Sequence, residues 1–74
     1  MYTCTLIWKD KNAPKMQEHA ATLETAKATV NHWAKTFAGV KALKIHDDPE
    51  KVVHIFTPSP QGATYQFSIP YIGK

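Results

Sequence analysis

Residues 22–39 constrain the fold most, because no other stretch is long and regular enough to predict a helix. Apolar side chains recur there with a helical period and fall within one arc about 100° wide. They are Leu23, Ala26, Val30, Trp33, Ala34 and Phe37. An arc of this width is typical of a surface helix that packs on a core, so the remaining segments must supply the opposing surface.

Both ends of this helix have recognisable signals. The Thr22 hydroxyl can accept a free backbone N–H as the N-cap, and Glu24 lies in the first turn, where the helix dipole favours an anion. Lys35 lies near the last turns, where a cation is favoured. Gly39 follows the last apolar residue, so we predict that it takes the left-handed conformation just beyond the C-cap.

One flank of the helix carries Lys27, Asn31 and Lys35 at four-residue intervals, which makes a polar ridge. The ridge can be a solvated flank whose lysine stems cover the edge of the core. It can also be a contact surface for an acidic or phosphate-bearing partner. These three residues are the candidate partner-binding residues.

The composition limits the classes of partner. The chain has 74 residues, which suits one domain over residues 1–74. All nine basic side chains are lysines, against six acidic ones. Lysine attracts phosphate as a point charge but lacks the planar fork that reads guanine or grips phosphate. Sequence-specific DNA reading is therefore disfavoured, whereas weak non-specific attraction to nucleic acid is expected.

The cellular compartment follows from what the sequence lacks. Cys4 is the single cysteine, so no intramolecular disulfide can form. Lys9 and Asp10 interrupt the short apolar run at the start, and no stretch approaches the ~20 apolar residues that a membrane span requires. We therefore expect a cytoplasmic protein without a membrane partner.

Before the helix, residues 2–9 alternate as a strand. The face predicted to meet the helix carries Tyr2, Cys4, Leu6 and Trp8. Cys4 is then a small core residue rather than a nucleophile. Residues 15–21 fit either a long loop or a short edge strand, and we favour the strand. Lys15 and Glu18 on such an edge would discourage pairing with another molecule.

After the helix, three strands are expected over residues 40–46, 51–57 and 63–69. The hairpin-length turns between them make these strands antiparallel neighbours. The fold class is therefore α+β, with a single helix on one face of a four- or five-stranded antiparallel sheet. The element order is β-(β)-α-β-β-β.

The inward faces of these strands differ in how clearly they are marked. Leu43 and Ile45 are predicted to face inward in the first strand. In the second, either Val53 and Ile55 or the alternate set faces the core, and that alternate set is Val52, His54 and Phe56. Two apolar faces indicate a central strand or an exposed apolar patch on the side away from the helix.

The last strand alternates, with Tyr65, Phe67 and Ile69 on one face. We interpret Tyr65 and Phe67, like Trp8, as core residues rather than as rings that stack on single-stranded nucleic acid. Pro70 ends the strand or places it at an edge of the sheet. Tyr71 and Ile72 follow, and they either pack back or project as an apolar anchor.

No residue pattern points to catalysis or to a cofactor. His46 and His54 could meet across a hairpin near Asp47 and Asp48, but their spacing matches no zinc signature. Asp47, Asp48 and Glu50 are interpreted as solvated turn charges. Because phosphate loops and nucleophile elbows are also missing, we expect no metal, no cofactor and no enzymatic activity.

The segment Ala20-Ala-Thr-Leu-Glu-Thr-Ala-Lys27 opens the helix. This segment, with the order of elements around it, resembles small phage and mobile-element proteins. In particular, it is similar to one group of anti-CRISPR inhibitors of type I surveillance complexes. The local likeness covers about eight residues, and the element order covers most of the chain.

That resemblance implies a non-enzymatic inhibitor that docks on the Cas backbone through a basic helix flank and blocks target DNA from pairing with the guide. Lys27 matches a contact lysine of that group, whereas the next position, basic there, is Ala28 here. Asn31 and Lys35 come from helical geometry alone. The expected partner is a host protein or ribonucleoprotein complex, bound by a monomer or a homodimer.

Two other functions fit the composition. A free-standing basic module that binds nucleic acid directly is the main alternative. A small enzyme or toxin is a third possibility, and it would depend on a polar residue such as His46 or His54.

Overall fold

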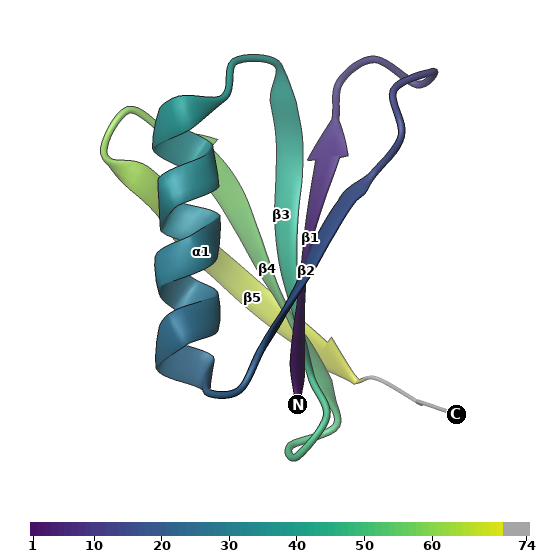
Figure 1. The fold of residues 1–74 in the computed structure, drawn as a ribbon, viewed down its shortest axis with the longest axis vertical. Helices are drawn as coiled ribbons and strands as arrows, with labels where there is room; N and C mark the ends of the chain where they lie inside the picture. The colour runs from purple at the N-terminus through teal and green to yellow at the C-terminus, as the bar shows by residue number, and fades with distance from the viewer. Residues whose placement is uncertain (71–74) are drawn as a thin grey trace.

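The computed structural model describes residues 1–70 and shows one helix packed on a five-stranded antiparallel sheet (Figure 1). The elements are β1 (Tyr2–Trp8), β2 (Met16–Ala20), α1 (Leu23–Thr36), β3 (Val40–Asp47), β4 (Val52–Ser59) and β5 (Gly62–Pro70). This confirms the predicted α+β class and element order. Tyr71 and Ile72 lie outside the described residues.

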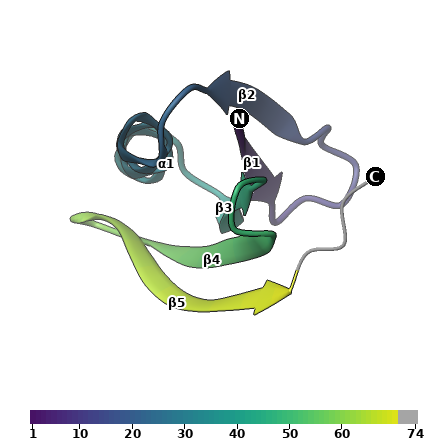
Figure 2. The ribbon, with the colours of Figure 1, turned by 90° about the horizontal axis from the view of Figure 1, so that it is seen from below.

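The strands follow the order β2-β1-β3-β4-β5, so β2 and β5 are the two edges. Viewed from below, the sheet curves around α1, which lies on its concave side (Figure 2). The weakly patterned segment before the helix does form an edge strand, which pairs with β1. The helix of residues 1–70, α1, has 14 residues, which is shorter than a membrane-spanning helix.

The start of α1 is as predicted, but its end is different. The Thr22 hydroxyl accepts the Thr25 N–H at 3.1 Å. At the other end, the extended residue Phe37 is the C-cap and donates its N–H to the Trp33 carbonyl at 3.0 Å. Gly39 has the expected positive φ of 77°, but it lies beyond the cap, where its carbonyl accepts the Lys9 N–H at 2.9 Å. The predicted helix-capping role of Gly39 is therefore wrong, and Gly39 instead joins the α1–β3 turn to the end of β1.

The core lies between α1 and the central strands. Its buried apolar side chains are Cys4, Leu6, Ala20, Ala26, Val30, Trp33, Val40, Leu43, Ile45 and Phe56. Tyr2 and Trp8 pack against this cluster, so the predicted inward face of β1 is confirmed. The predicted inward positions Leu43 and Ile45 on β3 are confirmed as well.

The register of β4 settles which of its two faces meets the helix. Phe56 pairs with Leu43 and His54 pairs with Ile45, both of which are core residues. Paired residues share a face of the sheet, so Phe56 and His54 lie on the helix side. Val53 and Ile55 lie on the opposite face of the sheet. We call this face, which is turned away from α1, the open face.

The regular alternation predicted for β5 is wrong because the strand contains a bulge. Tyr65 pairs with Phe56, whereas Phe67 pairs with Ile55, the next residue along β4. Gln66 is thus the extra residue, and Tyr65 and Phe67 fall on opposite faces. Each is 53% exposed, so the predicted core role of Tyr65 and Phe67 is also wrong. Bulges are common on edge strands, and β5 is an edge.

Replacing Leu43 with alanine tests the packing of α1 on the sheet. Leu43 is fully buried, so Leu43→Ala should lower the free energy of unfolding by ~2–5 kcal/mol, measured by urea denaturation. Lys41→Ala on the same strand is the control, because Lys41 is exposed and should change stability by less than ~0.5 kcal/mol. Equal effects of the two substitutions would contradict the assigned core.

Candidate interaction site between α1 and β5

The polar ridge of α1 lies alongside β5, and Asn31 joins the two elements. Its side-chain oxygen Oδ1 accepts the backbone N–H of Ala63 at 2.7 Å. The strand comes so close that a Cβ added at Gly62 would lie 2.5 Å from the same oxygen. Gly62 also has a φ of 131°, which side-chain-bearing residues rarely adopt. Asn31 therefore clamps the helix to the first residues of β5.

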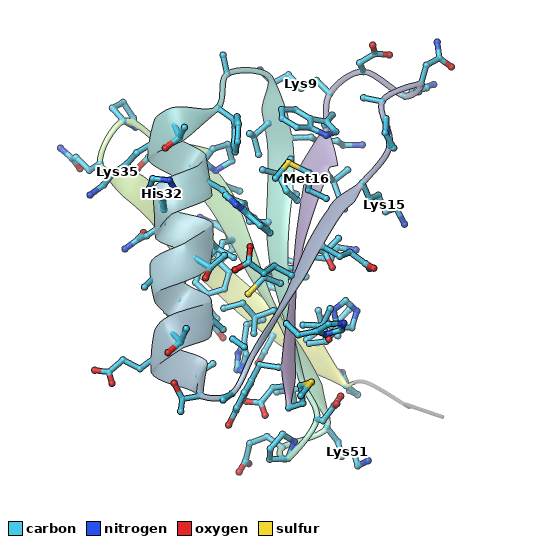
Figure 3. All side chains as sticks on the ribbon, viewed as in Figure 1. Lys9, Lys15, Met16, His32, Lys35 and Lys51 are labelled. Carbon is cyan, nitrogen blue, oxygen red and sulfur yellow. The ribbon has the colours of Figure 1, made fainter. Side chains whose placement is uncertain are left out.

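The two ridge lysines lie one helical turn to either side of this clamp. Lys35 is exposed, and its Cε lies near the start of β5, on the same side of α1 as the β4–β5 hairpin (Figure 3). Lys27 is exposed as well and lies at the rim of a pocket. The structure thus brings the three predicted residues to one flank, with Asn31 engaged in the fold and both lysines open to solvent.

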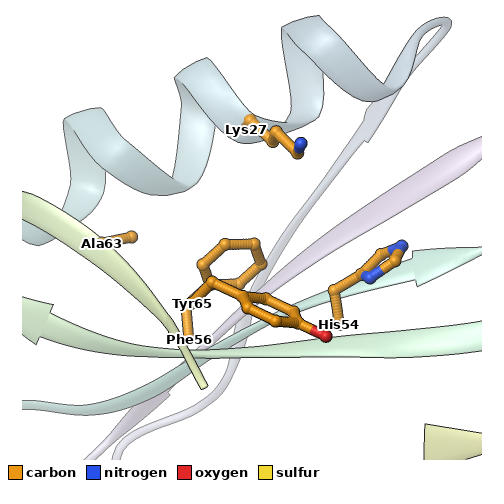
Figure 4. Close-up of a pocket in the computed structure, with 5 residues that line it drawn as sticks. All are labelled: Lys27, His54, Phe56, Ala63 and Tyr65. Carbon is orange, nitrogen blue, oxygen red and sulfur yellow. The ribbon is translucent and has the colours of Figure 1, made fainter. Parts of the chain in front are cut away.

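A pocket of about 430 Å³ opens between α1, β4 and β5. Lys27, His54, Phe56, Ala63 and Tyr65 line it (Figure 4). The Phe56 ring is mostly buried and meets the Tyr65 ring edge to face, with 5.8 Å between the ring centroids. Lys27 lies on the helix across from the two rings, and the Tyr65 hydroxyl points toward His54 (Figure 4).

Asp47 holds His54 in place from behind. Its carboxylate oxygen Oδ2 lies 3.0 Å from Nε2 of His54, and Oδ1 accepts the Glu50 N–H at 3.1 Å. Asp47 is only 1% exposed, so the prediction of a solvated turn charge is wrong. A buried carboxylate needs hydrogen-bond partners, and the imidazole and the turn backbone supply them. Nδ1 is the ring nitrogen of His54 that this pair leaves for other contacts.

The sequence pattern alone does not suggest that Asp47 and His54 pair, but the register of the β3–β4 hairpin predicts their contact. Residues 48–51 form the turn, so Asp47 pairs with Val52. His54 is two residues beyond Val52 and therefore shares its face. A diagonal contact between Asp47 and His54 follows from that count.

His46 and His54 do not converge, contrary to the arrangement considered for a metal. His46 pairs with Val53 on the open face, while His54 lies on the helix side. Across residues 1–70, no group of three or more His, Cys, Asp or Glu side chains is placed to hold a metal ion. The pocket instead offers an ammonium, an imidazole, a phenol and an apolar floor, which is chemistry for binding an anion with an apolar part.

β4 is an internal strand of the sheet, and its Val53 is only 6% exposed, so the central-strand interpretation of its two apolar faces is confirmed. The exposed apolar patch on the open face belongs to β5. Phe67 is 53% exposed and Ile69 is 44% exposed, and they pair with Ile55 and Val53. This patch lies on the face opposite to the pocket. Its role as a contact surface stays a prediction.

Cys4 has the environment of a core residue. Its side chain is fully buried, and its Sγ donates to the Ala26 carbonyl at 3.5 Å. Burial first, and the charge of Glu18 second, raise the pKa of the thiol to about 11. The thiolate needed for nucleophilic attack is therefore disfavoured at neutral pH.

Comparison with known proteins does not add a family to this description. No protein-family model, no curated protein and no solved structure matches the chain significantly. The site is therefore interpreted from its own residues and geometry.

Single substitutions along the ridge should separate the clamp from the two lysines. Asn31→Ala removes the bond to Ala63 and should lower the free energy of unfolding by about 0.5–1.5 kcal/mol. Lys35→Ala should stay within ~0.5 kcal/mol of the parent because Lys35 is exposed and forms no ion pair within residues 1–70. Urea denaturation measures both, and a larger loss for Lys35→Ala would overturn this division of roles.

Thiol labelling tests the assignment of Cys4. With a pKa of about 11, about one thiol in a thousand is ionised at pH 8 even before burial blocks the reagent. We expect an aromatic disulfide reagent to react at least 100-fold more slowly with the native chain than with the chain in denaturing urea. The rate should rise as pH increases toward 11. Equally fast labelling of native and unfolded protein would contradict a buried, protonated Cys4.

Proposed function

We propose that this chain is a small, non-enzymatic interaction protein whose α1–β5 flank docks on an acidic surface of a host protein or ribonucleoprotein complex. The observation that carries the proposal is the pair of exposed lysines on either side of the Asn31 clamp. Lys35 is eight positions after Lys27, so their backbones lie ~12 Å apart along the helix. Because the clamp ties that helix to β5, the two cations are carried on a preorganised surface.

Two lysines at a fixed spacing suit recognition of carboxylates or phosphates that have a matching spacing on the partner. They do not form the bidentate hydrogen bonds that an arginine makes with one such group. Lysines act as point charges, and they speed the approach of an oppositely charged partner more than they add to its affinity. The exposed Tyr65 ring at the same flank supplies apolar contact area, which lengthens the lifetime of a complex. Charge would guide docking, and Tyr65 would help to retain the partner.

The specific form of the proposal is a phage or mobile-element protein that acts in the host cytoplasm as an anti-CRISPR inhibitor. It would dock on a type I Cas surveillance complex and block target DNA binding by competition. Support comes from the helix-entry resemblance at residues 20–27, which includes Lys27, and from the exposure of Lys27 at the site. A competitive inhibitor of this kind needs no catalytic group.

The alternative, a free-standing nucleic-acid-binding module, has less support. Single-strand binding uses aromatic rings that line up along a basic groove so that successive bases stack. Tyr65 and Phe67 lie on opposite faces of the sheet, so they do not form one stacking platform beside the lysines.

Charge reversal of the ridge tests the specific proposal. In a gel-shift assay with purified type I surveillance complex and target DNA, the parent chain should block DNA binding. The double variant Lys27→Glu, Lys35→Glu should inhibit at least 10-fold less, because both proposed contacts become repulsive. The control is Lys41→Glu, Lys51→Glu, which changes net charge equally at exposed sites away from the α1–β5 flank. A folded ridge variant that inhibits as well as the parent would remove the ridge from the mechanism.

Capture from bacterial lysate with and without nuclease tests the broader proposal. A tagged parent chain should retain a protein complex after nuclease treatment, whereas the ridge variant should not. If nuclease treatment released all of the captured proteins, the result would favour the nucleic-acid-binding module instead. Direct binding of DNA or RNA that weakens steeply with salt would support that alternative further.

A further inference from the structure

We infer that the pocket between α1, β4 and β5 receives a carboxylate carried on a short apolar stem or ring. This inference rests on the proposed function, because it names the chemistry of the partner group that enters the same flank. In a protein partner, that group would be an acidic residue whose stem packs on the pocket floor. The apolar and polar parts of the pocket each contribute to the inference.

The apolar part comes from β4 and β5. Phe56 is 6% exposed and forms the floor, while Tyr65 stands against it in an edge-to-face contact. Tyr65 is 53% exposed, and the small side chain of Ala63 lines the pocket beside it. A stem or ring that enters here removes apolar surface from water on both sides. The volume of about 430 Å³ falls in the range typical of ligand pockets.

The polar part gives the pocket a preference for an anion. Lys27 is the cation of the lining, and no carboxylate lines the pocket with it. Within residues 1–70 the single ion pair is that of His54 with Asp47, so the Lys27 ammonium has no acidic partner there. The Asp47 side chain is 2% exposed behind His54, and both of its oxygens are engaged. A ligand in the pocket therefore meets the imidazole and makes no direct contact with this carboxylate.

His54 and Tyr65 can orient the bound carboxylate. Because Asp47 holds Nε2, His54 meets a ligand with Nδ1, which donates a hydrogen bond when the imidazole is protonated. The Tyr65 hydroxyl points toward the same ring (Figure 4), and the two ring centroids lie 6.3 Å apart. Lys27 on α1 and Tyr65 on β5 thus line the same space with donors, and His54 on β4 adds a third donor when its ring is protonated. Lys27 is the one ammonium of the lining that residues 1–70 form, and it balances the single charge of a carboxylate more closely than the charge of about −2 on a phosphate monoester.

Two small probes that differ only in charge test this inference. The probes are 3-phenylpropionate and its neutral amide, titrated into ¹⁵N-labelled protein and followed by NMR. We expect the carboxylate to bind with a millimolar Kd, at least 5-fold tighter than the amide, with the largest shifts at His54, Ala63 and Tyr65.

Substitutions at Lys27 and Tyr65 separate the contributions of the polar and apolar parts of the pocket to probe binding. Lys27→Met should abolish the preference for the carboxylate, whereas Tyr65→Ala should weaken both probes at least 5-fold. Lys41→Met is the matched control, because it removes the same charge from an exposed site outside the pocket. Should Tyr65→Ala lose its folded spectrum, Tyr65→Leu keeps an apolar side chain and should weaken the preference for the carboxylate while the protein stays folded.

Several results would overturn the inference. Equal affinities for the two probes, or a carboxylate preference that survives Lys27→Met, would show that Lys27 does not select an anion. Shifts confined to the open face around Phe67 would place the probe elsewhere. Phenyl phosphate binding at least 10-fold tighter than 3-phenylpropionate would reassign the pocket to phosphate.

The outcome is separable from that of the proposed function. Capture of a partner that depends on the ridge lysines but tolerates Tyr65→Ala and His54→Ala would support the docking function and overturn the pocket inference. Probe binding with the expected selectivity, together with no nuclease-resistant partner, would support the pocket and count against the function.

Discussion

The packing of one helix face on the concave side of the sheet is the interaction on which the structure depends. Ala26, Val30 and Trp33 bury the apolar stripe of α1 against core side chains of the strands, among them Leu6 and Leu43. The chain has 74 residues and a single cysteine, so it has no internal disulfide, and one core cluster holds residues 1–70 together. At ~0.05–0.15 kcal/mol per residue, its total stability is small enough that this one layer decides whether it folds.

The orientation of α1 on that layer also creates the candidate site. Because the apolar stripe is buried, the flank with Lys27, Asn31 and Lys35 faces β5. The hydrogen bond from the Ala63 N–H to Asn31 holds the helix against the start of that strand. The bulge at Gln66 then lets Tyr65 face the helix while Phe67 faces away. An unbroken strand would place both rings on the same face of the sheet. The pocket is therefore a product of a helix clamp and a strand irregularity together.

The sequence predicted the parts of the fold that repeat with a regular period. The helical stripe, the Thr22 cap, the alternation of β1 and the hairpin-length turns were enough for the α+β architecture. The incorrect predictions concern residues at a bulge or beside a turn, where the regular spacing of side chains is interrupted. Bulges leave no reliable mark in a single sequence, so the alternation of β5 predicts core positions for Tyr65 and Phe67 that they do not occupy. Asp47 was assigned to solvent because turn composition outweighed the hairpin register that pairs it with Val52.

The buried Asp47 is informative about the site because it is not the simplest way to fill that position. A buried ion pair seldom stabilises a fold more than apolar side chains of similar size would. Here the cost of burying a carboxylate is offset by the Glu50 N–H and by His54, whose ring lines the pocket. The same pair closes the β3–β4 turn and fixes one edge of the imidazole, so its other nitrogen is held ready for contacts of its own. The pair therefore places a held histidine beside Lys27 and an exposed tyrosine, on the same flank that we propose as the docking surface.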